Sequence, residues 1–130
     1  MKPEILVWIN KAEGDWETTL REAAVTVSPN LDAVCFHAQQ CAEKYLKAKL
    51  VLSEVSFRYS HDLLYLLELV LPIEPGWQFL HDSLFELTTF SVASRYPGLD
   101  ATPEQAARSV EHCRVVRQTI RNTLIADRNA

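Results

Sequence analysis

The sequence predicts an all-α protein, an antiparallel up-and-down bundle of four long helices plus one short helix. Three observations predict this fold. Apolar residues recur at helical spacing over long segments, prolines and cap-forming residues separate those segments, and no stretch keeps the period of two that marks a strand. Short connections favour antiparallel neighbours. With 130 residues, the chain is expected to form a single domain, 1–130.

The first predicted helix covers residues 3 to about 27. Pro3 fits its first turn, where a missing N–H is tolerated. The sequence Ser28-Pro29-Asn30 then interrupts the pattern, and either Ser28 or Asn30 is expected to cap the next helix. The apolar residues of this first segment keep helical spacing: Ile5, Trp8, Ile9, Ala12, Trp16, Leu20, Ala23, Ala24 and Val27.

The segment from Leu31 to Leu52 has the clearest helical periodicity and contains neither Gly nor Pro. A helix that is apolar over so much of its circumference is expected to be central in its domain, or to be buried by a partner as well. Its polar stripe is either a solvated face or the lining of a cleft or interface, and consists of His37, Gln40, Lys44 and Lys47. The residues on its apolar face are Leu31, Val34, Cys35, Ala38, Cys41, Ala42, Tyr45, Ala48 and Leu52.

Two further helices follow in the middle of the chain. The third is expected to begin with Ser60 as its N-cap and to end at Pro72. The fourth is expected to begin at Pro75 and to end before Pro97, because the residue before a proline is disfavoured in the α region.

The fifth helix has the strongest start signal in the chain. The sequence Thr102-Pro103-Glu104-Gln105 predicts a capping box, with Thr as the N-cap and Gln reaching back to it. A basic stripe follows on this helix and favours a solvated face over an RNA-binding ridge. The stripe consists of Arg114, Arg117, Arg121 and Arg128.

Composition excludes several classes of function. The net charge of −4 argues against a globally basic binder of nucleic acid or membrane. No apolar run approaches the roughly 20 residues of a membrane span, and the first residues lack a signal-peptide pattern. The three cysteines occupy apolar helical positions, so we expect buried thiols and a cytoplasmic location. Neither a zinc pattern nor a glycine-rich phosphate loop is present, so no metal or cofactor is expected.

Two short sequences could carry chemistry. His61-Asp62 lies at a predicted helix N-terminus, where backbone N–H groups suit an anion. Alternatively, His61 satisfies a loop carbonyl while Asp62 caps the helix. Arg95-Tyr96-Pro97-Gly98 places a planar cation at a rigid turn, which suits phosphate or carboxylate capture, with Tyr96 stacking on a base. In the alternative reading, Arg95 ties the loop to helix-end carbonyls.

Together these sequences resemble a known family. Residues 36–48, FHAQQCAEKYLKA, resemble the phrase FHAQQAAEKALKA of the HEPN family (higher eukaryotes and prokaryotes nucleotide-binding). Ser60-His61-Asp62-Leu63 resembles the family's T/S-HDL, and Arg95-Tyr96-Pro97 resembles its RYP. The earlier Ala12-x-x-Asp15-Trp16 is similar to the family's A-x-x-D-L. Order and spacing match over nearly the whole chain.

The resemblance implies an all-α homodimer paired with a minimal nucleotidyltransferase, often as a toxin–antitoxin pair. It also implies a cleft near the dimer interface that binds nucleotide or RNA. Many members are metal-independent RNases with an Arg-x4-6-His motif. This sequence departs from that motif, because Asp100 and Ala101 stand where a His after Arg95 is needed. Arg108 and His112 are separated by only three residues, and Arg58 and His61 by two.

We therefore expect a nucleotide- or partner-binding protein that is non-catalytic or weakly catalytic. The alternatives are an RNase toxin, with a composite site of Arg95 and either His61 or a residue from the other protomer, and a structural dimer without a ligand. In the binding hypothesis Arg95 contacts phosphate and Tyr96 shapes the site or stacks. The other candidate residues are His61 and Asp62 in a neighbouring wall, and Lys44 and Lys47 as secondary phosphate contacts.

Overall fold

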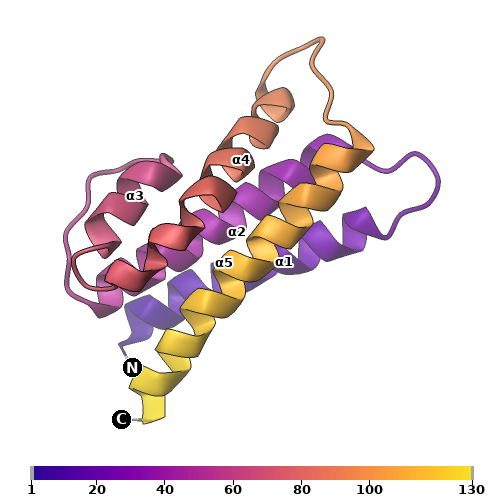
Figure 1. Cartoon of the computed structure of the whole chain (residues 1–130). Helices are drawn as coiled ribbons and strands as arrows, with labels where there is room; N and C mark the ends of the chain where they lie inside the picture. The colour runs from indigo at the N-terminus through magenta and orange to yellow at the C-terminus, as the bar shows by residue number, and fades with distance from the viewer. Residues whose placement is uncertain (1, 130) are drawn as a thin grey trace.

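The computed structural model describes residues 2–129, and for residues 125–129 it describes the backbone only. Helices and turns make up this range, without a strand, as the periodicity predicts (Figure 1). The two termini lie near the same end of the bundle. The α-helices are α1 (Pro3–Ala23), α2 (Leu31–Leu52), α3 (Leu63–Val70), α4 (His81–Ser91) and α5 (Pro103–Asn129), and two 3-10 turns are η1 (Pro75–Leu80) and η2 (Val92–Arg95).

The central element is α2, which contacts the four other α-helices. Its side chains are buried on nearly all sides, because its sequence is apolar over most of its girth. Tyr45, Leu46 and Leu50 are fully buried. Burying a side chain of this size stabilises the fold by about 1.5–3 kcal/mol. The prediction that this helix organises the domain is confirmed.

The three cysteines are free thiols in the core, as the sequence predicts. Cys41 lies beside Cys113 across the contact between α2 and α5, and both their mutual contact and burial raise the pKa of the Cys41 thiol. Burial likewise raises the pKa of Cys35. Thiols in this environment pack as small apolar side chains.

The first helix ends four residues earlier than predicted, at Ala23. Val27 is 81% exposed, so the apolar pattern beyond Ala23 is not matched by burial in the chain. Asn30 is the cap of α2, because its side chain accepts a hydrogen bond from the Ala33 N–H at 3.0 Å. The Asn30 N–H in turn donates to the Glu22 carboxylate at 2.6 Å, which closes the connection onto the end of α1.

The third and fourth helices are shorter than the sequence suggests. Asp62, and not Ser60, is the N-cap of α3. Ser60 instead accepts a hydrogen bond from the Asp62 N–H at 3.0 Å. The predicted fourth helix begins at Pro75 as the 3-10 turn η1, continues as α4, and ends in η2 before Pro97.

The last helix begins as predicted. The Thr102 hydroxyl accepts from the Gln105 N–H at 3.1 Å, and the Gln105 side chain accepts from the Thr102 N–H at 3.0 Å. This reciprocal pair is a capping box.

The basic stripe of α5 divides into parts with different partners. Arg117 and Arg121 pair with Glu13 of α1, at 2.6 and 3.5 Å, so these two arginines join helices. Arg114 is exposed and pairs with Glu111. Arg128 lies outside the described side chains. No helix in the described part of the chain has the length and apolar character to cross a membrane.

Candidate functional site

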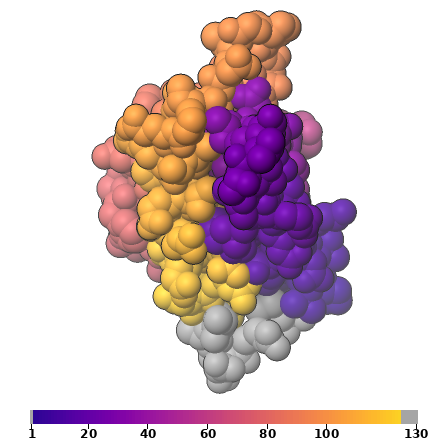
Figure 2. Space-filling view, turned by 90° about the vertical axis from the view of Figure 1, so that its right-hand side faces the viewer, coloured from indigo at the N-terminus to yellow at the C-terminus, as the bar shows by residue number. Residues whose placement is uncertain are grey.

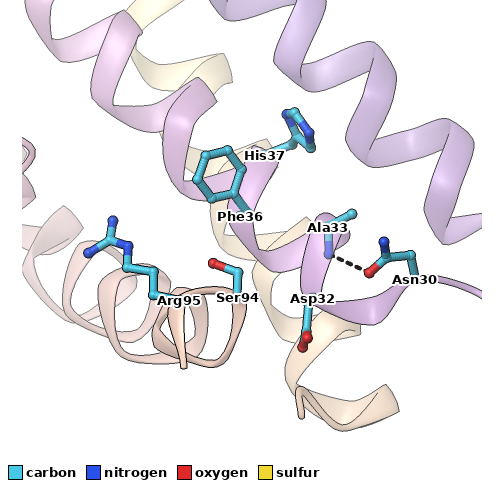
Figure 3. A pocket seen from close by; sticks show the side chains of 7 residues that line it. All are labelled: Asn30, Asp32, Ala33, Phe36, His37, Ser94 and Arg95. Carbon is cyan, nitrogen blue, oxygen red and sulfur yellow. Dashed lines mark hydrogen bonds between the residues drawn. The ribbon is translucent and has the colours of Figure 1, made fainter. Parts of the chain in front are cut away.

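An open cleft lies at the N-terminal end of α2, against the 3-10 turn η2 (Figure 3). Its volume is about 380 Å³, within the range of small-molecule sites. We call it the Arg95 cleft; it is lined by Asn30, Asp32, Ala33, Phe36, His37, Ser94 and Arg95. One turn and a half of α2 therefore supplies most of the lining, and η2 supplies the opposite wall.

Arg95 is positioned by the end of η2. The following residue, Tyr96, has an extended backbone because Pro97 disfavours the α region before it. Gly98 then adopts a φ of +86°, a conformation that side chains other than glycine rarely tolerate. The connection from Tyr96 to Asp100 is exposed and projects from one end of the molecule (Figure 2). Arg95 is thus held at the base of a fixed turn.

The Arg95 guanidinium is exposed and has neither a hydrogen bond nor an ion pair with any described side chain. Figure 3 shows Arg95 on η2, across the cleft from Phe36 of α2. Tyr96 is 58% exposed and does not line the cleft. Of the candidate residues from the sequence, Arg95 is the one that the cleft contains.

The other polar groups at this end of α2 are engaged in holding the backbone. Asn30 caps α2, as described above. The Asp32 carboxylate accepts a hydrogen bond from the Ala101 N–H at 2.8 Å, across 69 residues of sequence. This bond joins the segment before α5 to the first turn of α2 at the polar end of the cleft.

His37 faces the cleft from α2 and is oriented by a buried carboxylate. Its Nδ1 lies 2.8 Å from Oδ1 of Asp15 on α1. The second oxygen of Asp15 accepts a hydrogen bond from Lys44. Asp15 is about 10% exposed and His37 31%, so the carboxylate lies behind the ring and the ring reaches solvent. Lys44 is therefore already paired with a carboxylate and is not free to meet a phosphate.

A second polar cluster surrounds Glu43, further along α2. We call it the Glu43 cluster; its members are Gln39, Glu43, Lys47, Tyr59 and His61. Lys47 Nζ lies 3.1 Å from Glu43, and His61 Nδ1 lies 3.0 Å from both oxygens of the same carboxylate. Gln39 donates to Glu43 and to the His61 backbone carbonyl, at 3.3 Å each.

The Glu43 cluster is closed to ligands on the side of Lys47. The ammonium lies 5.5–5.9 Å from the ring centres of Trp8, Phe57 and Tyr59, and the Lys47 side chain is 5% exposed. His61 is exposed at 47%, but its Nε2 lies 3.0 Å from the Tyr59 hydroxyl. These contacts hold the connection between α2 and α3 in place.

The structure does not bring His61, Asp62 and Lys47 to the cleft of Arg95. Asp62 accepts hydrogen bonds from the Leu64 and Tyr65 N–H groups at 3.1 and 3.3 Å. These are the bonds that an N-cap side chain normally makes. His61 contacts Glu43, seven residues along α2 from Phe36. Seven residues of helix span about 10 Å. The suggested composite of Arg95 and His61 is therefore not assembled in this chain.

Arg108 and His112, the pair that comes nearest to the Arg-x4-6-His spacing, hold two helices together. Both side chains contact Glu86 of α4, and His112 Nδ1 also lies 3.0 Å from the Ser83 hydroxyl. They join α4 to α5.

A third polar cluster joins α1, α2 and α5 around Glu13. Burial alone raises the pKa of Glu13, but the hydrogen bonds from Arg117 and Tyr45 outweigh it and lower the pKa. Burial, together with the bond to Glu13, raises the pKa of the Tyr45 hydroxyl far above its ordinary value. The hydrogen bonds of Glu13 raise the pKa of Arg117 in turn. This cluster stabilises the bundle.

Sequence reasoning placed His37 on the stripe of α2 but did not identify its partner. The signal was present, since Asp15 belongs to the Ala12-x-x-Asp15-Trp16 sequence and His37 to the segment 36–48. Within the described side chains, no group of three or more His, Cys, Asp or Glu residues is arranged to hold a metal ion.

Comparison with known proteins and family models identifies the family to which the chain belongs. No curated protein and no solved structure matches the chain. A family model described as HEPN domain matches residues 5–123, which include the whole of α2, α3 and α4 and most of α1 and α5. The matched range covers both the Arg95 cleft and the Glu43 cluster. The chain belongs to the HEPN domain family.

Proposed function

We propose that this HEPN protein binds a nucleotide, with Arg95 as the residue that contacts its phosphate. The observation that supports the proposal most is that the Arg95 guanidinium is exposed and unpaired among the described side chains. It lies at the wall of a cleft, whereas Lys44 and Lys47 are held by carboxylates. A planar guanidinium can bind two phosphate oxygens at once.

The lining of the cleft agrees with such a ligand. Phe36 offers a half-buried aromatic ring between Arg95 and His37, against which a base can lie. The Asp32 carboxylate repels an anion, so the phosphate belongs on the Arg95 side of the cleft.

In this proposal the protein binds and does not cleave, or cleaves weakly. The alternative RNase would use Arg95 with His61, and His61 lies outside the Arg95 cleft. A general acid or base must reach the reacting proton within hydrogen-bond distance or through one water. Cleavage of RNA by the wild type, lost in both Arg95→Ala and His61→Ala, would favour the RNase instead.

The test compares Arg95→Ala with the matched control Arg114→Ala by calorimetric titration of AMP. Arg114 is an exposed arginine on α5 that pairs with Glu111 and lies away from the cleft. We expect Arg95→Ala to lower the affinity at least tenfold, because a charge-assisted contact is worth about 1.5–3 kcal/mol. Arg114→Ala should bind as the wild type does. Equal affinities of the wild type and Arg95→Ala would overturn the assignment of this site.

We also propose that the protein is a homodimer that works with a minimal nucleotidyltransferase in a toxin–antitoxin-like pair. The support is membership of the HEPN family and the FHAQQ, SHDL and RYP sequences that resemble it. The three free thiols fit a reducing cytoplasm. Co-expression with a minimal nucleotidyltransferase from the same genome tests the pairing, and failure of the two to copurify at physiological salt would contradict it.

A further inference from the structure

The Asp15–His37 pair gives the Arg95 cleft a hydrogen-bond acceptor of fixed position. An ionised carboxylate can only accept hydrogen bonds, so the His37 nitrogen that faces Asp15 must carry the proton. In the neutral ring this leaves Nε2 without a proton. Nε2 has no hydrogen-bond partner among the described side chains, and His37 lines the cleft.

The geometry points to a base-reading role for His37. We propose that the cleft prefers nucleotides whose base carries an exocyclic amino group, adenine or cytosine, because His37 Nε2 accepts a hydrogen bond from that group. The proposal rests on the nucleotide-binding function proposed above. It adds the identity of the base and the residue that reads it.

Three side chains lie in the order that such a ligand requires. Figure 3 shows Arg95 on one side of Phe36 and His37 on the other. The rings of Phe36 and His37 are nearly perpendicular, at 87°, with centroids 5.2 Å apart. A phosphate at Arg95 therefore places the sugar and base along Phe36, with the outer edge of the base toward His37.

The tautomer of His37 can be tested by changing Asp15 to Asn, because Lys44 fixes the orientation of the side chain at position 15. Lys44 carries only donors, and it occupies Oδ2 of Asp15. In Asp15→Asn, the single remaining oxygen turns toward Lys44, so the amide NH₂ faces His37. The His37 nitrogen there must then accept, and the proton moves to Nε2. The cleft then presents a donor where the wild type presents an acceptor.

The experiment measures the affinities of AMP and IMP, which differ at position 6 of the purine, amino in AMP and carbonyl in IMP. CMP and UMP form a second pair. In mildly alkaline buffer we expect the wild type to prefer AMP over IMP, and CMP over UMP, by about five- to tenfold, the value of one hydrogen bond. Asp15→Asn should reverse both preferences.

A second variant covers the case in which Asp15→Asn does not fold. His37→Phe keeps an aromatic ring and removes both nitrogens, and His37 is partly exposed, so the fold is expected to persist. This variant should bind AMP and IMP equally. A preference for AMP that survives in His37→Phe would overturn the base-reading role.

Failure of this inference differs from failure of the proposed function. If all four nucleotides bind in an Arg95-dependent manner but equally well, the phosphate site stands and His37 does not read the base. If none of them binds, both proposals fail. Tighter binding of the trinucleotide ApApA than of AMP would identify the ligand as an RNA strand, and equal or weaker binding would identify it as a free nucleotide.

Discussion

Two polar groups packed against α2, the Glu43 cluster and the Arg95 cleft, hold their cations in opposite electrostatic states. In the Glu43 cluster, a buried carboxylate is shared by a lysine and a histidine, and aromatic rings cover the lysine. In the Arg95 cleft, the arginine is exposed and unpaired among the described side chains. A charge already satisfied by its neighbours supports the fold, whereas an unsatisfied one is available to a ligand. The predictions below test this division.

The largest expected effect is the loss of the Glu43 carboxylate. Glu43→Ala leaves the Lys47 ammonium buried without its partner, and breaking a buried pair in this way costs about 3–5 kcal/mol. Urea unfolding followed by circular dichroism gives the change in free energy of unfolding. Glu111→Ala is the control, because it removes a carboxylate from an exposed pair, worth at most about 1 kcal/mol. Similar losses in the two variants would remove the distinction between the clusters.

A smaller effect is expected at the cap of α3. Asp62→Ala removes an acceptor for two backbone N–H groups and should cost about 1 kcal/mol in unfolding free energy. Asp62→Asn keeps an acceptor and should retain most of the stability. Neither change should alter AMP affinity, because Asp62 does not line the Arg95 cleft. A loss of affinity in Asp62→Asn would restore this residue to the binding site.

The smallest expected effect is a difference in the acid dependence of stability. The pKa of Glu13 is lowered in the folded protein, from an ordinary value of 4.5. Its contribution to stability is therefore present above 4.5 and is lost as the pH falls through the lower, folded value. Measured against pH, the unfolding free energy of the wild type should fall more steeply in this acid range than that of Glu13→Gln. Parallel curves would show that Glu13 does not stabilise the bundle through its charge.

The sequence predicts the fold because the fold depends on local patterns. Helical spacing identifies α2 as the central element, and the Thr102-to-Gln105 capping box forms as predicted. Errors lie at helix ends, where local pattern and tertiary contact compete. Val27 continues the apolar pattern of α1, but it lies beyond the end of the helix and its side chain is exposed.

The site is less predictable, because it depends on contacts between distant segments. Glu43 and Lys47 form an (i, i+4) pair that the sequence displays, but the rings that bury it come from α1 and from the connection after α2. Asp15 and His37 are 22 residues apart, and only the packing of α1 against α2 joins them. Arg95 could be proposed from the sequence alone because its position depends on the local Tyr96-Pro97-Gly98 turn.

The burial of two lysines in α2 has a consequence for limited proteolysis. Trypsin requires an extended, accessible segment around a basic residue, and Lys47 and Lys49 lie in mid-helix with side chains no more than 5% exposed. Cleavage after either lysine thus requires global unfolding. Arg95 ends a helical turn and is followed by an exposed connection, so cleavage after Arg95 needs no unfolding of the core, and bound ligand would slow it. The rates at these two places would report occupancy of the cleft and opening of the core separately, in one digestion.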